Sequence, residues 1–514
     1  DTGEVVLLDV RERGAYAEGH LLFAVSAPLG RLEIDIERLV PRRATPIVVI
    51  DDGIDDDRAH RAAARLDSFD YAAVEILSNG IAGWRAAGEE VFDGVYVPSK
   101  AFGEYVEEHC DTPRLTADDL AARIGDGTDM VILDSRPFKE FRRMSIPGAI
   151  NVPGGELVHR VRDLAPNPET LVVVNCAGRT RSIIGAQSLI NAGTPNPVMA
   201  LKNGTMGWSL AGHALDHGRT TVAPAPSADA RSWAAEAAAR VTARYSVPRI
   251  DQATLARYRD EADDHTLYIC DVRTIEEFET GHPPGARHTP GGQLVQASDS
   301  YVPVNNARIV VVDDDGVRAT MAASWLIQMG RRNVCVLADA LAETALETGT
   351  EPVTARATRH REITVEALAE LPAATVIDLA DSRRFIAGHI NGAWWTVRAR
   401  LAEALATLPV PKRIVVTSPD GVIAHLAAPE VEDILGCQVE VLAGGTDAWA
   451  AGGHTLTPSD KRMVGVRDDI HLLPYDHPKD EIEAAMHAYL KWETALVPRV
   501  KRDAVARFDV TRHG

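Results

Sequence analysis

The chain has few cysteines, no long apolar run and a deficit of positive charge, and each shortage disfavours a class of protein. Its 514 residues include only five cysteines, without a Cys-x-x-Cys spacing. A scattered, odd set argues against a disulfide framework or a zinc site and favours a reducing, cytoplasmic compartment. No apolar run approaches the roughly 18 residues that a membrane-spanning helix needs, so we expect no membrane partner.

The charge balance bears on the partners. Lysine and arginine number 54 against 74 acidic residues, which gives a formal net charge of −20. A nucleic-acid partner needs a basic face, so this class of ligand is disfavoured. Apolar residues make up 45% of the chain and charged residues 25%, which is typical of globular proteins with several domains at this length.

Four segments of the chain share the same motifs at a spacing of about a hundred residues, the size of a domain. Each has a strand that ends in aspartate, followed by an aromatic residue and a Gly-His or Pro-Gly-Ala element. Short Val/Ile strands alternate with helical stretches, which predicts an α/β fold with parallel sheets covered by helices on both faces. We predict repeat one at 1–97, repeat two at 98–222, a linker helix at 223–249, repeat three at 250–355, repeat four at 356–458 and a C-terminal tail at 459–514.

The lead-in to each repeat and the linker suggest how the repeats are arranged. Short predicted helices precede repeats two, three and four, so about twenty native residues are expected before Asp1. The Ala/Pro stretch 223–226 falls between repeats two and three, and the helix after it is expected to pack on one half. We therefore expect repeat one to pair with two, walling its site, and three to pair with four. The tail predicts a packed helix over 479–496, with a lid or dimerisation element as the alternative.

One cysteine lies in a chemically distinctive setting. The sequence predicts a buried strand at 172–174 and a helix at 182–191, with Cys176 on the tight loop between them. Free N–H groups of such a loop and of a helix N-terminus point at one spot and favour an anion there. Arg179 and Arg181 add positive charge close by, and both effects favour the nucleophilic thiolate. A reactive thiol is therefore favoured over a buried structural cysteine.

The sequence Cys176-Ala-Gly-Arg-Thr-Arg-Ser182 after a valine-rich strand resembles the active-site loop of the rhodanese (thiosulfate sulfurtransferase) family. The Asp134-x-Arg136 strand end, the Pro-Gly-Ala loop at 147–149 and the Gly-x-x-Gly-Trp ending at 204–208 match the family as well. Related phosphatases of the Cdc25 type have one more residue between cysteine and arginine. The Cys-x4-Arg spacing here therefore disfavours phosphatase or arsenate reductase activity.

The resemblance implies a double-displacement sulfur transfer. Cys176 would take the outer sulfur of a small anionic donor such as thiosulfate and pass it, as a persulfide, to cyanide or a thiol acceptor. No metal and no organic cofactor are implied, and a homodimer is left open. Asp134 and Arg136 would orient the loop without touching substrate. The substrate would be held by the rest of the loop, that is by Ala177, Gly178, Arg179, Thr180, Arg181 and Ser182.

The other three repeats are expected to be catalytically silent. Where we align the thiol, they carry Asp52, Asp314 and Pro419, none of which offers a sulfur nucleophile. The two aspartates would also repel an anionic donor. Three silent repeats keep open a second reading, a largely non-catalytic sulfur-relay or partner-binding protein.

The remaining candidate side chains are interpreted as structural. Four further cysteines fall in a helix or at strand positions and are expected to be packing residues: Cys110, Cys270, Cys335 and Cys437. Three histidines occur only in repeats without the thiol and lack a second ligand at metal-binding spacing: His20, His282 and His389. Neither group is expected to carry chemistry.

Overall fold

The computed structural model describes residues 3–342, 345–351, 359–371, 373–408, 413–503 and 506–510. The chain forms two compact units. Unit 1 comprises Asp1–Val6, Val95–Pro352 and Leu473–Gly514, and unit 2 comprises Leu7–Gly94 and Val353–Leu472. Repeats two and three therefore share unit 1, and repeats one and four share unit 2. The expected pairing of one with two and of three with four is wrong.

The linker between repeats two and three explains part of this outcome. It contains helix α11 (Ala228–Tyr245), which begins where the Ser227 hydroxyl accepts a hydrogen bond from the Ala230 amide at 3.1 Å. α11 contacts α8 (Leu157–Leu164) of repeat two and also α16 (Val317–Gln328) of repeat three. Its buried alanines allow this close packing, so the helix joins both repeats instead of lying on one half.

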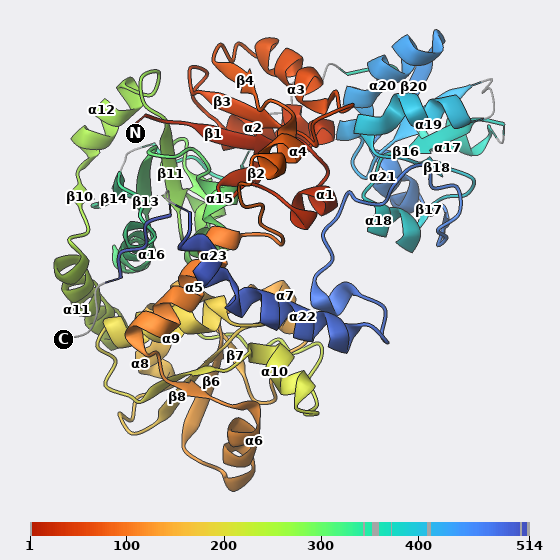
Figure 1. The fold of residues 1–514 in the computed structure, drawn as a ribbon. Helices are drawn as coiled ribbons and strands as arrows, with labels where there is room; N and C mark the ends of the chain where they lie inside the picture. Colours follow the sequence, from red (N-terminus) through yellow and green to blue (C-terminus); the bar gives the residue numbers. More distant parts are fainter. Residues whose placement is uncertain are drawn as a thin grey trace. The chain divides into compact units, whose positions relative to one another are not determined.

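Repeat two is a five-stranded sheet in the order β5-β9-β8-β6-β7, and the strand pairs are parallel. Its strands are β5 (Arg114–Leu115), β6 (Met130–Asp134), β7 (Ile150–Asn151), β8 (Leu171–Asn175) and β9 (Val198–Leu201). Besides α8, its helices are α6 (Ala117–Asp126), α7 (Phe138–Arg143), α9 (Thr180–Asn191) and α10 (Gly204–Leu210). Figure 1 labels these elements apart from β5 and β9.

The central strand β8 is buried on both faces, as its valine run predicts. Val173 belongs to the hydrophobic core that includes Leu120 of α6 and Trp208 of α10. Val174 faces the opposite side, where a Cβ on Gly185 of α9 would lie 3.0 Å from its side chain. Helices therefore cover both faces of the sheet, in agreement with the predicted fold class.

Repeat three repeats this topology with the strand order β10-β14-β13-β11-β12. Its strands are β10 (Arg249–Ile250), β11 (Leu267–Asp271), β12 (Arg287–His288), β13 (Arg308–Val312) and β14 (Val334–Leu337). Its helices, with α16, are α12 (Gln252–Asp260), α13 (Ile275–Thr280), α14 (Gly291–Gln296) and α15 (Ser298–Tyr301). Among the described residues of repeat three, no helix takes the place of α10, which closes repeat two.

Unit 2 holds two further sheets, in the orders β2-β1-β3-β4 and β15-β20-β19-β16-β18. The first, in repeat one, contains β1 (Val6–Asp9), β2 (Ala24–Ser26), β3 (Ile47–Ile50) and β4 (Val74–Ile76), with α1 (Arg13–Glu18), α2 (Leu32–Leu39), α3 (Arg58–Asp67) and α4 (Gly80–Ala86). The second contains β15 (Glu362–Ile363), β16 (Thr375–Asp378), β18 (Trp394–Trp395), β19 (Ile414–Thr417) and β20 (Val439–Leu442), with α17 (Val365–Ala369), α18 (Ser382–Ala387), α19 (Leu401–Thr407), α20 (Val422–Leu435) and α21 (Gly445–Ala451). Short strands β17 (His389–Ile390) and β21 (Leu456–Thr457) pair antiparallel beside it.

The C-terminal tail contributes helices α22 (Ile482–Thr494) and α23 (Leu496–Val500) to unit 1. Both contact α5 (Val97–Cys110), the long helix that precedes repeat two (Figure 1). α22 is therefore a packed helix close to the predicted range, and its place beside the Cys176 loop was not predicted. Within the described residues, no helix has the length and apolarity needed to cross a membrane.

Candidate active site around Cys176

Cys176 lies directly after β8 and four residues before α9, on the loop that the sequence predicts. The residue is only 2% exposed. Its thiol donates a hydrogen bond to the Ser182 hydroxyl at 3.5 Å, and that hydroxyl in turn donates to the Arg179 carbonyl at 2.8 Å. The loop thus curls around the sulfur at the N-terminal end of α9, where unpaired helix N–H groups favour an anion.

The closing motif of the repeat holds this loop in place. The amides of Thr205 and Met206 donate to the carbonyls of Cys176 and Ala177 at 2.9 and 3.0 Å. Gly204, with a φ of +54°, makes this approach possible, because a Cβ there would lie 2.3 Å from the Cys176 carbonyl oxygen. The glycine of the Gly-x-x-Gly-Trp motif is thereby explained as a requirement for close backbone contact.

Arg179 is bound by carboxylates from outside the repeat's sheet. Its guanidinium donates to both oxygens of Glu104 at 2.6 Å and to Glu107 at 2.5 Å, both from α5, and to Asn203 at 3.0 Å. The side chain is 6% exposed. Two carboxylates compensate its charge, so in this structure Arg179 ties the loop to α5.

Arg181 has a different environment. It forms a two-pronged pair with Glu140 of α7 at 2.8 and 2.9 Å, and one of its N–H groups donates to the amide oxygen of Gln293 in repeat three at 3.3 Å. Burial lowers the pKa of Arg181, but the neighbouring Glu140 and, to a smaller extent, Cys176 raise it above its usual value, and its side chain is 14% exposed. A cleft between repeats two and three is lined by Thr180, Arg181 and Trp325 among others. Repeat three therefore borders this site.

The C-terminal helix covers the other side of the loop. Glu493 of α22 is fully buried and accepts a hydrogen bond from the Thr180 hydroxyl at 2.6 Å. A Cβ on Gly178 would lie 3.2 Å from the Tyr489 ring, so only glycine fits here without displacement of that ring. Lys100 of α5 donates to the Tyr489 hydroxyl and to Glu493. The tail thus buries the loop that carries the thiol.

Sequence reasoning did not identify Lys100, Glu104, Glu107, Tyr489 and Glu493 as parts of this site. Spacings of three and four residues place each set on one face of its helix. The same spacing of charged residues is typical of solvent-exposed helix faces, so no local signal separates the two cases.

A cluster of charged groups accompanies this arrangement. Three carboxylates, Glu104, Glu107 and Glu493, contact three cations, Arg179, Lys100 and Arg114. Burial raises the pKa of Glu104 to about 7, with Glu493 and Glu107 adding to the rise and Arg179 opposing it. Glu104 is therefore expected to hold a proton up to near-neutral pH.

This proton predicts a pH dependence of stability. An unfolded glutamate releases its proton near the ordinary value of 4.5, whereas folded Glu104 keeps it until about pH 7. Between these values the folded state binds more protons, so the free energy of unfolding falls as pH rises through this window. Thermal unfolding of wild type and Glu104→Gln at pH 5 and pH 8 checks this. The variant should lose less stability between the two pH values, and an equal loss would contradict the assignment.

Asp134 and Arg136 form a pair behind the loop. Arg136 donates to Asp134 at 2.7 and 2.9 Å and to the Met144 carbonyl at 2.6 Å, and Asn175, next to the thiol, donates to Asp134 at 3.0 Å. The equivalent arginine–aspartate pairs of repeats one and three are also present, although these repeats lack the thiol: Arg11–Asp9 and Arg273–Asp271. The motif therefore fixes the strand-to-helix turn, and Asn175 connects this turn to the loop.

The hydrogen bonds correct the alignment of the silent repeats in unit 2. The amides of Ile81 and Thr446 donate to the carbonyls of Asp51 and Ser418 at 2.9 and 3.0 Å, as Thr205 does to Cys176. Asp51 and Ser418, not Asp52 and Pro419, therefore occupy the position of the thiol. In repeat one the two neighbouring aspartates, Asp51 and Asp52, carry no register, so the sequence could not fix the alignment there.

Repeat three requires the same one-residue correction. Asp134 pairs with Asn175 in repeat two, and Asp271 pairs with Val312 in repeat three, so the next residues, Cys176 and Asp313, are equivalent. Asp313, not Asp314, replaces the thiol. Its carboxylate accepts hydrogen bonds from the Gly316 and Ala319 amides at 2.6 and 3.0 Å. The anion-binding end of α16 is thus filled by the protein's own carboxylate, and none of the three corrected residues provides sulfur.

The other cysteines and the three histidines are mostly structural. Cys270 and Cys335 are buried, and burial raises the pKa of these thiols to about 12 and about 11. Cys110 is half-buried, but Cys437 is exposed, so its interpretation as a packing residue is wrong. The three histidines are buried and stack on the aromatic residue four positions earlier: His20 on Tyr16, His282 on Phe278 and His389 on Phe385.

Comparison with known proteins places this geometry in context. The rhodanese-like domain model matches residues 1–87, 116–211 and 252–345. A crystal structure of thiosulfate sulfurtransferase from Pseudomonas aeruginosa is 48% identical, with a TM-score of 0.95, and the match covers 99% of this chain and 97% of that one. The family model thus matches within repeats one to three, and the solved structure matches nearly the whole chain.

Curated relatives match over shorter stretches. "Putative sulfur carrier protein YrkF" of Bacillus subtilis is 33% identical over 90 residues, which cover 17% of this chain and 46% of the relative. "Putative thiosulfate sulfurtransferase SseB" of Mycobacterium tuberculosis is 32% identical over 195 residues, which cover 30% of this chain and 66% of the relative. The chain spans less than two thirds of the length of these two relatives.

Proposed function

Because this chain belongs to the rhodanese-like family, we propose that it is a sulfurtransferase that carries a sulfane sulfur as a persulfide on Cys176. The observation that carries the proposal is the position of the Cys176 thiol, between the end of β8 and the N-terminus of α9. The name of the Pseudomonas aeruginosa relative supports thiosulfate as the donor. Cyanide or a small thiol is the proposed acceptor.

The proposed reaction has two displacements. The Cys176 thiolate attacks the outer sulfur of thiosulfate, the sulfur–sulfur bond breaks, and sulfite leaves with the bonding electron pair. The persulfide then rests in the loop, where helix N–H groups stabilise its negative charge. Cyanide attacks the terminal sulfur, thiocyanate forms, and the Cys176 thiolate is regenerated. The cycle balances without a metal or an organic cofactor.

The two loop arginines receive different roles in this proposal. Arg181 binds the sulfonate oxygens of the donor, because it has a single carboxylate partner among the described residues and lines the cleft. Arg179 keeps the loop in place through Glu104 and Glu107. Ala177, Gly178 and Thr180 contribute backbone N–H groups, and Ser182 contacts the thiol through its hydroxyl. Asp134 with Arg136 orients the loop.

Further parts of the proposal concern the chain as a whole. We propose residues 356–458 as a fourth domain of the same family, which the shared strand order supports. Five free cysteines support a reducing, cytoplasmic setting. The small exposure of Cys176 beneath α22 favours a small acceptor over the alternative, a relay that docks a partner protein.

Thiosulfate treatment of the full chain tests the proposal. Intact-mass measurement should show the gain of one sulfur atom, about 32 Da, because one loop carries a reactive thiol. Cyanide should remove the added mass, and Cys176→Ser should gain none. No mass gain in the wild-type protein would overturn the persulfide mechanism. A gain of several sulfurs would show that other cysteines react.

A further inference from the structure

Repeats two and three meet through equivalent glycine pairs. Each pair follows a proline, in Pro153-Gly-Gly and Pro290-Gly-Gly. A Cβ on Gly155 would lie 3.2 Å from the Gly291 Cα, and a Cβ on Gly292 would lie 3.1 Å from the Gly154 Cα. Only glycine allows the two backbones to approach this closely. The residue after each pair, Glu156 in repeat two and Gln293 in repeat three, is thereby brought to the opposite repeat.

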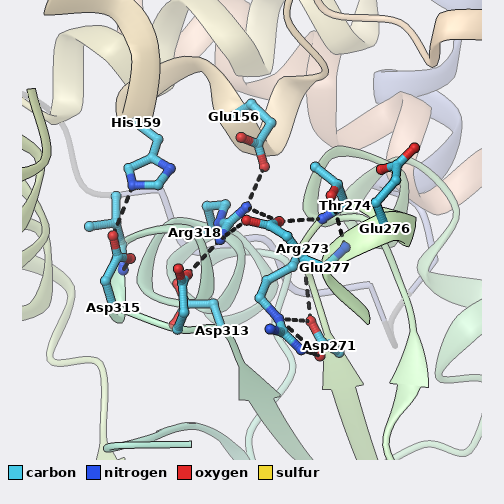
Figure 2. Close-up of polar contacts among 12 residues, drawn as sticks. Glu156, His159, Asp271, Arg273, Thr274, Glu276, Glu277, Asp313, Asp315 and Arg318 are labelled. Carbon is cyan, nitrogen blue, oxygen red and sulfur yellow. Dashed lines mark hydrogen bonds and ion pairs between the residues drawn. The ribbon is translucent and has the colours of Figure 1, made fainter. Parts of the chain in front are cut away.

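Glu156 and Gln293 contact equivalent arginines. Arg181 and Arg318 are the second residues of α9 and α16, and each pairs with a glutamate of its own repeat, Glu140 or Glu277. Arg318 also donates to Glu156 of repeat two at 2.8 Å, whereas Arg181 donates to Gln293 of repeat three at 3.3 Å. Figure 2 shows Glu156 and Glu277 around Arg318 of repeat three.

The surroundings of Arg181 and those of Arg318 differ in charge. Arg318 contacts three carboxylates, Glu156, Glu277 and Asp314, at 2.8, 2.7 and 2.5 Å, and its side chain is fully buried. Arg181, among the described residues, contacts one carboxylate and the neutral amide of Gln293. Ala177 stands where repeat three has Asp314. An anion that approaches Arg181 therefore meets less negative charge than it would at Arg318.

We propose that Gln293 of repeat three is a positioning residue that keeps a second carboxylate away from Arg181 and thereby admits anionic sulfur donors to the Cys176 loop. This inference rests on the proposed function. It gives silent repeat three a role in the chemistry, because the neutral side chain at 293 comes from that repeat. It also predicts selectivity by charge, since a second carboxylate beside Arg181 would repel dianionic donors more strongly than monoanionic donors.

The test replaces Gln293 in the full chain with glutamate and, separately, with methionine. Gln293→Glu places a carboxylate beside Arg181, as Glu156 does beside Arg318. Gln293→Met removes the hydrogen bond to Arg181 without adding charge. For Gln293→Glu we expect the KM for thiosulfate to rise about 10- to 100-fold, with kcat changed less than about 3-fold. For Gln293→Met we expect a KM within about 3-fold of the wild type, because the charge is unchanged.

The equivalent contact at Arg318 supplies a matched control. Glu156→Gln makes the mirror-image replacement beside Arg318 of repeat three and should leave the KM for thiosulfate unchanged. Melting temperatures of all variants report any loss of folding. Equal KM values for Gln293→Glu and wild type, or equal rises for the glutamate and methionine variants, would overturn the charge-setting role. A wild-type protein that gains no sulfur from thiosulfate would overturn the proposed function as well.

Discussion

Replacement of Cys176 by serine is expected to abolish thiocyanate formation from thiosulfate and cyanide. The hydroxyl is close in size to the thiol but holds no sulfur, so the persulfide cannot form. The loop is fixed by backbone hydrogen bonds from Thr205 and Met206, which the substitution leaves intact. The melting temperature should therefore change by less than about 4 °C, the shift that corresponds to 1 kcal/mol in a domain of this size.

Cys437→Ser is the matched control, because Cys437 is an exposed free cysteine in unit 2. It should keep full turnover and the same mass gain with thiosulfate. Turnover near the wild-type rate in Cys176→Ser would place the chemistry elsewhere in the chain. A folded but inactive Cys437→Ser would show that a second thiol takes part.

The second large effect is expected at Arg181. Arg181→Ala should lower kcat/KM for thiosulfate roughly 30- to 1000-fold. This corresponds to a loss of about 2–4 kcal/mol in transition-state stabilisation, the range for loss of one charged donor at a developing anion. Glu140 would remain without its arginine and add repulsion toward the donor. Steady-state kinetics with thiosulfate and with mercaptopyruvate measure the effect. Mercaptopyruvate carries one negative charge, so the fall in kcat/KM for this donor should be smaller. An equal fall for both donors would mean that Arg181 only organises the loop.

Arg318→Ala in repeat three provides the comparison. Arg318 has the same place in its helix but contacts three carboxylates and lies next to no thiol. Its removal deprives the buried Glu156 and the partly exposed Glu277 and Asp314 of their shared cation. The expected loss is therefore in stability, about 3–5 kcal/mol, and not in the KM for thiosulfate. A fall in kcat/KM without loss of stability would contradict this division of roles.

Local sequence determined the parts of the site that depend on neighbouring residues. The valines before Cys176 specified a strand buried on both faces, and the helical spacing after it specified α9. Together they placed the thiol at a helix N-terminus, as predicted. The repeated Asp-x-Arg triplets also form the pairs that their recurrence suggested. In each case the interacting groups lie within a few residues of one another, so the chain order itself brings them together.

Only the tertiary structure decided what the loop contacts. Glu104, Gln293 and Glu493 reach the loop from segments 75, 112 and 313 residues away from their partners, and no local pattern records such contacts. The same holds for the pairing of repeat two with repeat three, which rests on close packing of glycine backbones and of α11. Shape complementarity between whole surfaces selects these contacts, whereas strands and helices follow from local periodicity. The sequence thus placed the Cys176 thiol on the loop before α9. The packed structure determined which of the two loop arginines has a single carboxylate partner.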